Sequence, residues 1–130
     1  MLQSRWLLVA VLLAACSDPQ PVDQNQRGEL VDGDRRHPQD NSPMDEYPFE
    51  VANGWQITVD MHSDVFDTYL HLVDPSGTVV AQNDDREPGN THDSRIQHTA
   101  ATGGTWKVWA NSYDANGRGA YTVHIVARGQ

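Results

Sequence analysis

The feature that most limits what this chain can fold into is a series of short runs in which apolar and polar residues alternate. Seven such runs follow one another from the middle of the chain onward, at residues 46–51, 55–61, 67–73, 78–82, 94–99, 105–112 and 119–127. Turn-forming pairs such as Asn53-Gly54 and Gly103-Gly104 separate them, a punctuation typical of β-sandwiches and barrels. After the first 15 residues, no segment keeps the apolar spacing of a helix over three turns. The sequence therefore predicts an all-β fold.

Side-chain parity assigns a core face to these strands, because successive side chains of a strand point to opposite faces. The inward set comprises Ile57, Val59, Leu70, Leu72, Trp106, Val108, Ala110, Tyr121, Val123 and Ile125. Tyr69, His71 and Trp109 point outward. Two apolar faces stacked about 10 Å apart form a sandwich core, and a domain of about 100 residues buries enough surface to fold alone.

The N-terminus has a different character. The uncharged run at residues 6–15 follows Arg5 and is too short to cross a bilayer core of about 30 Å as a helix. A positive charge, a short apolar stretch and small residues at its end indicate a secretory signal. Residues 16–26 are polar and contain two prolines, which indicates a flexible tether. We therefore expect a signal at 1–15, a tether at 16–26 and one domain at 27–130, with a short first strand at 27–30.

Cys16 is the only cysteine in the chain, so in an exported protein it has no partner for an internal disulfide. The residues Leu13-Ala14-Ala15-Cys16 resemble the bacterial lipobox. This resemblance implies lipidation of Cys16 with two or three acyl chains such as palmitate, and hence a stable membrane anchor, whereas one chain binds only marginally. In lipoproteins of Gram-negative bacteria, an aspartate directly after the cysteine tends to retain the protein at the inner membrane. This chain has Ser17 at that position, which favours a location at the outer membrane, facing the periplasm.

The formal net charge of −9 and the single lysine, Lys107, limit the possible partners. Nucleic acid is disfavoured, because its phosphates are held by lysine and arginine. The acidity is compatible with a divalent cation.

The strands also carry an ordered series of short motifs. They are Asp45-Glu46-Tyr47-Pro48-Phe49, Phe66-Asp67-Thr68-Tyr69-Leu70, Asp74-Pro75-Ser76-Gly77, Asn83-Asp84-Asp85, Gly104-Thr105-Trp106-Lys107-Val108 and Gly119-Ala120-Tyr121-Thr122-Val123. The series resembles the bacterial pre-peptidase C-terminal domain, over residues 28–127. The resemblance implies a jelly-roll-like β-sandwich of about seven to eight antiparallel strands that is not catalytic. Some relatives in clostridial collagenases bind collagen and calcium.

Two acidic groups are candidate sites. Asp67 and the turn Asn83-Asp84-Asp85 end strands, and Arg95 is a candidate ion-pair partner for one of these carboxylates. Asn and Asp suit strand-ending turns through bonds to nearby backbone N–H groups, so we interpret these five residues as a structural turn motif, with calcium binding as the alternative. In the calcium-binding relatives, ligands come from the regions that correspond to Asp34 and Asp45, although Arg35 and Arg36 would repel a cation.

Trp109 and Tyr113 face outward and are candidate ligand contacts, unless a neighbouring strand or loop covers Trp109. The six histidines show no metal-ligand spacing, and we interpret them as scattered surface residues.

No nucleophile elbow, phosphate loop or dinucleotide fingerprint occurs. We therefore expect a non-catalytic binding module, lipid-anchored in the cell envelope, with a protein or polysaccharide partner. The alternatives are a calcium-stabilised structural accessory domain and, third, an enzyme.

Overall fold

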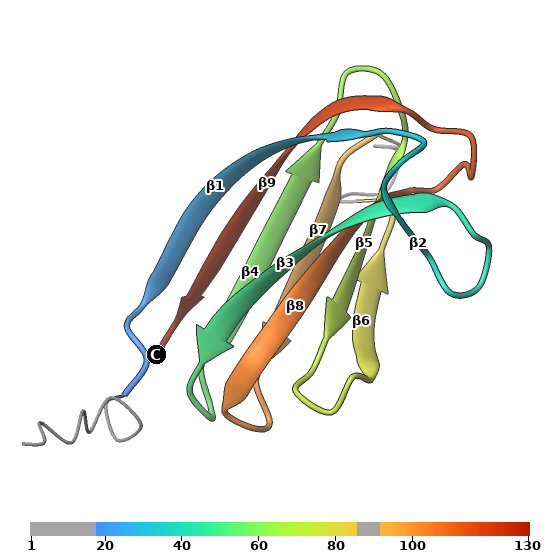
Figure 1. Ribbon diagram of the computed structural model, residues 1–130. Coiled ribbons are helices and arrows are strands. Elements are labelled where there is room, and N and C mark those ends of the chain that lie inside the picture. The colour runs from blue at the N-terminus through green and yellow to red at the C-terminus, as the bar shows by residue number, and fades with distance from the viewer. Residues whose placement is uncertain (1–17, 86–91) are drawn as a thin grey trace, which may run out of the picture.

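The computed structural model describes residues 18–85 and 92–130 as strands joined by turns (Figure 1). The strands are β1 (Val22–Leu30), β2 (Arg35–Arg36), β3 (Pro43–Val51), β4 (Gln56–His62), β5 (Thr68–Val73), β6 (Val79–Asn83), β7 (Ser94–Thr99), β8 (Gly104–Ser112) and β9 (Gly119–Arg128). No helix occurs in these two ranges. The all-β prediction is confirmed, and the seven main strands lie where the polarity pattern placed them, to within three residues at each end.

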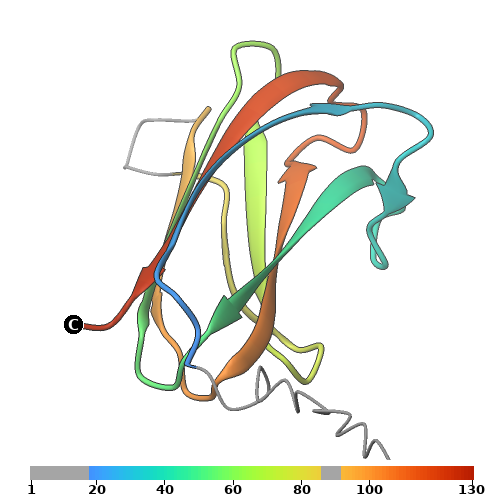
Figure 2. The ribbon, with the colours of Figure 1, turned by 60° about the vertical axis from the view of Figure 1, so that its left-hand side comes forward.

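The strands form two antiparallel sheets that stack face to face. One sheet has four strands in the order β1-β9-β4-β7, and the other has five in the order β2-β3-β8-β5-β6. Figure 2 shows the layers from the side, with β1 and β9 in one layer and β3 and β8 in the other. The predicted sandwich is confirmed. The strand beyond the expected seven or eight is β2, whose two residues are too few to leave an alternating pattern in the sequence.

The core lies between the sheets and consists of the side chains that parity assigned inward. Every one of the ten is at most 3 % exposed. Trp106 is the largest fully buried side chain, and its indole N–H donates to the backbone oxygen of Thr102 at 3.1 Å. Burial of these side chains is the main stabilising contribution to the fold.

Strand β1 begins earlier than the sequence suggested. It pairs with β9 along its whole length, from Val22 opposite Ala127 to Leu30 opposite Gly119. The assignment of residues 22–26 to a flexible tether was therefore wrong. Except for Val22, which packs against the core, these residues are polar, and they alternate only between half-buried and exposed. The segment is therefore held mainly by backbone hydrogen bonds at the sheet edge.

A polar network closes the sandwich beside β1. The Tyr121 hydroxyl donates to the Asp45 carboxylate and accepts a hydrogen bond from the Tyr47 hydroxyl. Gly28 of β1 lies directly against the two hydroxyl groups: a Cβ atom there would lie 2.3 Å from Tyr121 Oη and 2.7 Å from Tyr47 Oη. Only a residue without a side chain allows β1 to pass this close to both tyrosines.

Candidate binding face

Five aromatic rings form a continuous row on the outer face of the five-stranded sheet. In order along the row they are Tyr113, Tyr69, His71, His37 and Trp109, with successive ring centroids 6.0, 4.4, 4.6 and 5.7 Å apart. We call this set the aromatic row. Two rings come from β5, one from β8, one from the residue after β8 and one from the loop between β2 and β3.

Strand register explains why rings from distant parts of the sequence meet. Strands β5 and β8 pair so that His71 lies opposite Trp109, and side chains opposite each other on one face of an antiparallel pair are in contact range. Tyr69 is two residues before His71 and therefore shares its face. Tyr113 is held beside Tyr69 because its N–H donates to the backbone oxygen of Asp67 at 2.9 Å.

The loop between β2 and β3 brings His37 over the sheet. It is closed by two backbone hydrogen bonds, from His37 N–H to Ser42 O at 2.8 Å and from Asn41 N–H to His37 O at 2.9 Å. The buried Asn111 amide of β8 donates to Ser42 Oγ and to Pro43 O, both at 2.8 Å. These bonds fix the loop on the sheet, so the aromatic row is formed before any ligand arrives.

His71 is the most unusual member of the row. It is 3 % exposed, and its Nε2 atom has no hydrogen-bond partner in the described part of the chain, although most buried polar groups have one. Burial, assisted by neighbouring His37, lowers the pKa of His71 to about 4. The imidazole is therefore neutral at pH 7, with one nitrogen as donor and the other as acceptor.

Two of the histidines interpreted as surface residues are thus buried. His37 is 7 % exposed and His71 is 3 % exposed. The prediction was wrong for them because each covers the other, and sequence spacing does not show that a loop folds back onto an outer sheet face.

Small hollows open on the two sides of His71. One has a volume of about 150 Å³ and is bordered by Asp40, Tyr69 and Tyr113. The other has a volume of about 210 Å³ and is bordered by Val79, Gln82 and Trp109. His37, Gln39 and His71 line both hollows. The aromatic row therefore borders two adjoining depressions rather than a flat surface.

The two candidate contact residues from the sequence lie at opposite ends of this row. Tyr113 is 61 % exposed. Trp109 is half-buried, with the His37 ring edge-on to it and its indole N–H donating to Glu46 Oε1 at 3.5 Å. The outward parity of Tyr69 and His71 was visible in the sequence, but the part played by His37 was not.

The acidic turn residues gather at one end of β5 and β6. The pKa of Asp67 is raised by burial and by the neighbouring Asp85 and Asp84 carboxylates. The Asn83 side chain accepts the Arg95 backbone N–H at 3.2 Å. The Arg95 guanidinium donates to Asp60 Oδ1 at 2.6 Å, an acidic residue that the sequence analysis had not considered as its partner.

Asp34 and Asp45, the residues assigned to calcium by resemblance, lie close to each other. Burial and the neighbouring Asp34 carboxylate raise the pKa of Asp45. Asp45 already accepts the Tyr121 hydroxyl, and Asp34 Oδ2 accepts the Val31 N–H at 2.8 Å. Within residues 18–85 and 92–130, no three His, Cys, Asp or Glu side chains are placed to hold a metal ion. Two carboxylates are few for an ion that takes six to eight oxygen ligands, so the calcium site stays a prediction.

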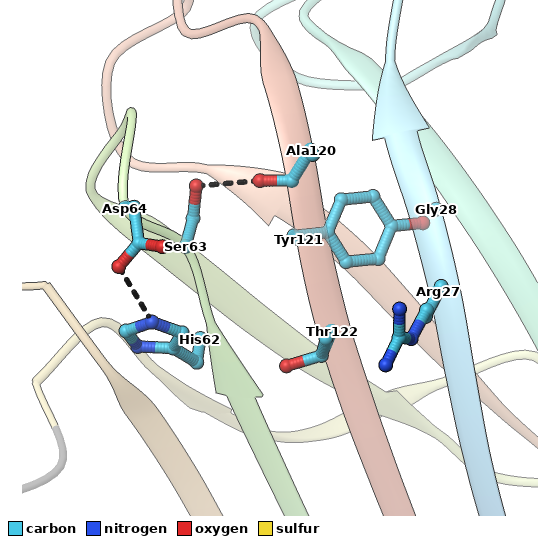
Figure 3. A pocket seen from close by; sticks show the side chains of 8 residues that line it. All are labelled: Arg27, Gly28, His62, Ser63, Asp64, Ala120, Tyr121 and Thr122. Carbon is cyan, nitrogen blue, oxygen red and sulfur yellow. Dashed lines mark hydrogen bonds and ion pairs between the residues drawn. The ribbon is translucent and has the colours of Figure 1, made fainter.

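A third hollow, of about 200 Å³, lies on the outer face of the four-stranded sheet (Figure 3). Arg27 of β1 and His62 of β4 flank Thr122 of β9, because both lie opposite it in the strand register. His62 bonds to Asp93 at 2.5 Å and to Asp64 at 2.9 Å. The bond to Asp93 is the main cause that raises the pKa of His62.

Ser63 lies beside this histidine and raises the question of nucleophilic catalysis. Its hydroxyl donates to the backbone oxygen of Ala120 at 2.8 Å and accepts the Val65 N–H at 3.2 Å. In Figure 3 the bonds of Ser63 and His62 run to different partners. A serine nucleophile needs a base that takes its proton. The Ser63 hydroxyl donates to a backbone oxygen and not to His62, so Ser63 and His62 do not form a nucleophile–base pair in this arrangement.

The lipidation site predicted at Cys16 lies outside the described residues. Among those that are described, no helix is long and apolar enough to span a membrane.

Comparison with known proteins shows the family to which the chain belongs. Residues 44–112 match the family model of the bacterial pre-peptidase C-terminal domain. No curated protein sequence is similar enough to count as a match.

Solved structures share the sandwich at low sequence identity. PliG of Aeromonas hydrophila, a periplasmic inhibitor of g-type lysozyme, has a TM-score of 0.61 and 11 % identity, over 83 % of this chain and 88 % of its own. The pre-peptidase C-terminal domain of a Bacillus anthracis collagenase has a TM-score of 0.61 and 20 % identity, over 80 % and 89 %. PliG of Salmonella Typhimurium has a TM-score of 0.50 and 14 % identity, over 86 % and 91 %. At these identities the likeness shows the fold alone.

Proposed function

Because the chain belongs to the bacterial pre-peptidase C-terminal domain family, we propose that it is a non-catalytic binding module whose contact surface is the aromatic row. The observation that carries this proposal is the row itself: five rings in sequence, fixed by a hydrogen-bonded loop and ending in an exposed tyrosine. Aromatic side chains are enriched at the centres of binding interfaces, where they supply much of the affinity.

Rigidity makes this surface suitable for binding. The loop that carries His37 is held by backbone hydrogen bonds and by the Asn111 amide, and the other rings belong to or adjoin strands in the middle of the sheet. A surface that is ordered before contact loses less conformational entropy on binding. Solved structures that share the fold include inhibitors of a lysozyme, which supports a role in binding without catalysis.

The same proposal places the domain in the cell envelope. Lipidation at Cys16 would tether it to the outer membrane, facing the periplasm, through the residues that precede β1. The family match and the periplasmic lysozyme inhibitors that share its fold support this location. The domain would then hold its partner, a protein or a glycan, within reach of the membrane.

Truncating the side chains at the two ends of the aromatic row should weaken binding of the partner. We expect the double variant Trp109→Ala/Tyr113→Ala to capture its partner at least fivefold less than the parent chain does, when each is crosslinked in native envelopes and the products are quantified by mass spectrometry. Trp and Tyr are enriched among the few interface residues whose truncation costs more than about 1 kcal/mol, so losing one of each produces a large effect.

The matched control is His124→Ala. His124 lies on the opposite sheet, pairs with Asp23 at 2.7 Å and is 42 % exposed at its side chain. This variant should capture as much partner as the parent does. Equal capture by the double variant, with an unchanged circular-dichroism spectrum, would refute the aromatic row as the contact surface.

A further inference from the structure

The unpartnered imidazole nitrogen in the aromatic row indicates what kind of ligand the row binds. His71 Nε2 is buried and bonds to nothing within the described ranges, and a buried polar atom without a partner costs roughly 1–3 kcal/mol. Leucine at this position would avoid that cost. His71 lines both adjoining hollows, and a ligand hydroxyl that reached Nε2 would also remove this cost, because a hydroxyl group both donates and accepts and therefore suits either tautomer of a neutral imidazole.

The hollows beside His71 are the size of single rings. At about 150 and 210 Å³, each is smaller than the roughly 300–1,000 Å³ of pockets that enclose a drug-sized ligand. They share His37, Gln39 and His71 as a common wall. Two adjoining ring-sized depressions fit consecutive units of a chain of rings.

The walls of these hollows combine ring faces with neutral polar groups. Tyr69 and Tyr113 stack at an interplanar angle of 26° at one end, and Trp109 borders the other end. Aromatic faces carry partial negative charge and therefore attract the C–H faces of sugar rings. Gln39 and Gln82 supply amides among the lining residues. Stacking surfaces interspersed with amides suit a ligand that has apolar faces and hydroxyl edges.

The negative charge of the chain disfavours acidic carbohydrates as ligands. The chain carries a net charge of −9, and the Asp40 carboxylate lines one hollow. An anionic polysaccharide would be repelled, whereas the Asp40 oxygens would accept hydrogen bonds from a neutral one. We propose that the hollows on the two sides of His71 bind consecutive units of a neutral oligosaccharide, an inference that rests on the proposed function and specifies its ligand.

Titration with defined sugars tests this inference. The probes are the hexamers of glucose and of N-acetylglucosamine as neutral chains, a hexamer of galacturonic acid as an anionic chain, and the single neutral sugars. The fluorescence of Trp109, which borders one hollow, reports binding, with Trp109→Phe identifying its share of the signal. We expect saturable binding of at least one neutral hexamer, at least tenfold weaker binding of its monomer, and no binding of the anionic chain.

Two variants locate the site. His71→Leu should weaken binding about tenfold, since it removes one hydrogen bond and the fit of the shared wall, while leaving the melting temperature unchanged or higher. Tyr113→Ala, at a side chain that is 61 % exposed, should weaken binding without any effect on folding. His124→Leu, on the opposite sheet, should bind as the parent does.

Absence of saturable binding of either neutral hexamer up to about 10 mM would overturn the oligosaccharide, as would equal binding by Tyr113→Ala. If crosslinking through the row still captured a protein partner, the binding face would stand and only its ligand class would be wrong. If neither sugar nor protein depended on the row, the proposed function would fall as well.

Discussion

Replacing Gly28 with alanine is expected to lower the free energy of unfolding by about 3 kcal/mol, the upper end of what overpacking costs. The new Cβ atom would lie 2.3 Å from Tyr121 Oη and 2.7 Å from Tyr47 Oη, so β1 or both rings would have to move. Either movement disturbs the hydroxyl bonds that join Tyr121 to Asp45 and Tyr47. Urea unfolding at pH 7 measures the loss.

Gly33→Ala is the matched control for this substitution. No atom lies within 4 Å of a Cβ at Gly33, so its unfolding free energy should stay within about 0.5 kcal/mol of the parent value. If Gly28→Ala were as stable as Gly33→Ala, the close approach of β1 to the tyrosine pair would be wrong.

Acidification from pH 7 to pH 5 is expected to cost the folded state about 2 kcal/mol through His71 alone. Burial lowers its pKa from the usual 6.5 to about 4 in the folded protein, whereas the unfolded chain regains the ordinary value. Between these two values the unfolded state binds the extra proton. The contribution of His71 to stability is therefore complete above about pH 6.5 and is lost as the pH falls towards 4.

The variant His71→Leu isolates this effect. Urea unfolding of the parent and the variant at pH 7 and pH 5 should show a parent that loses about 2 kcal/mol more than the variant does. His62, whose pKa is raised by Asp93 and Asp64, titrates in the opposite sense in both proteins and cancels in the difference. An equal loss in both proteins would mean that His71 is accessible to protons in the folded state.

Alternating polarity was sufficient to predict most of this fold. It placed the main strands, and all ten side chains that it assigned inward are buried, because burial between two sheets imposes a period of two on each strand. The first strand was partly missed for the same reason: residues 22–26 are at most half-buried, and an edge strand held by backbone bonds leaves no such period. The two-residue strand β2 was too short for any pattern.

The binding face was predicted only in part. Parity put Tyr69, His71 and Trp109 outward, and the sequence marked Trp109 and Tyr113 as contacts, but nothing along the chain showed that these side chains share one row. Their proximity depends on the register of β5 against β8. The position of His37 depends on the fold of a loop, and the burial of His71 depends on that loop covering it. These are tertiary facts without a local signature.

A photo-crosslinking residue placed at position 113 or at position 124 of the full chain in living cells tests the central claim most directly. Position 113 ends the aromatic row, and position 124 lies on the opposite sheet, where 42 % of the His124 side chain is exposed. Crosslinked product from position 113, and little or none from position 124, is the result that the account predicts. Equal products from both positions, or product from position 124 alone, would contradict it.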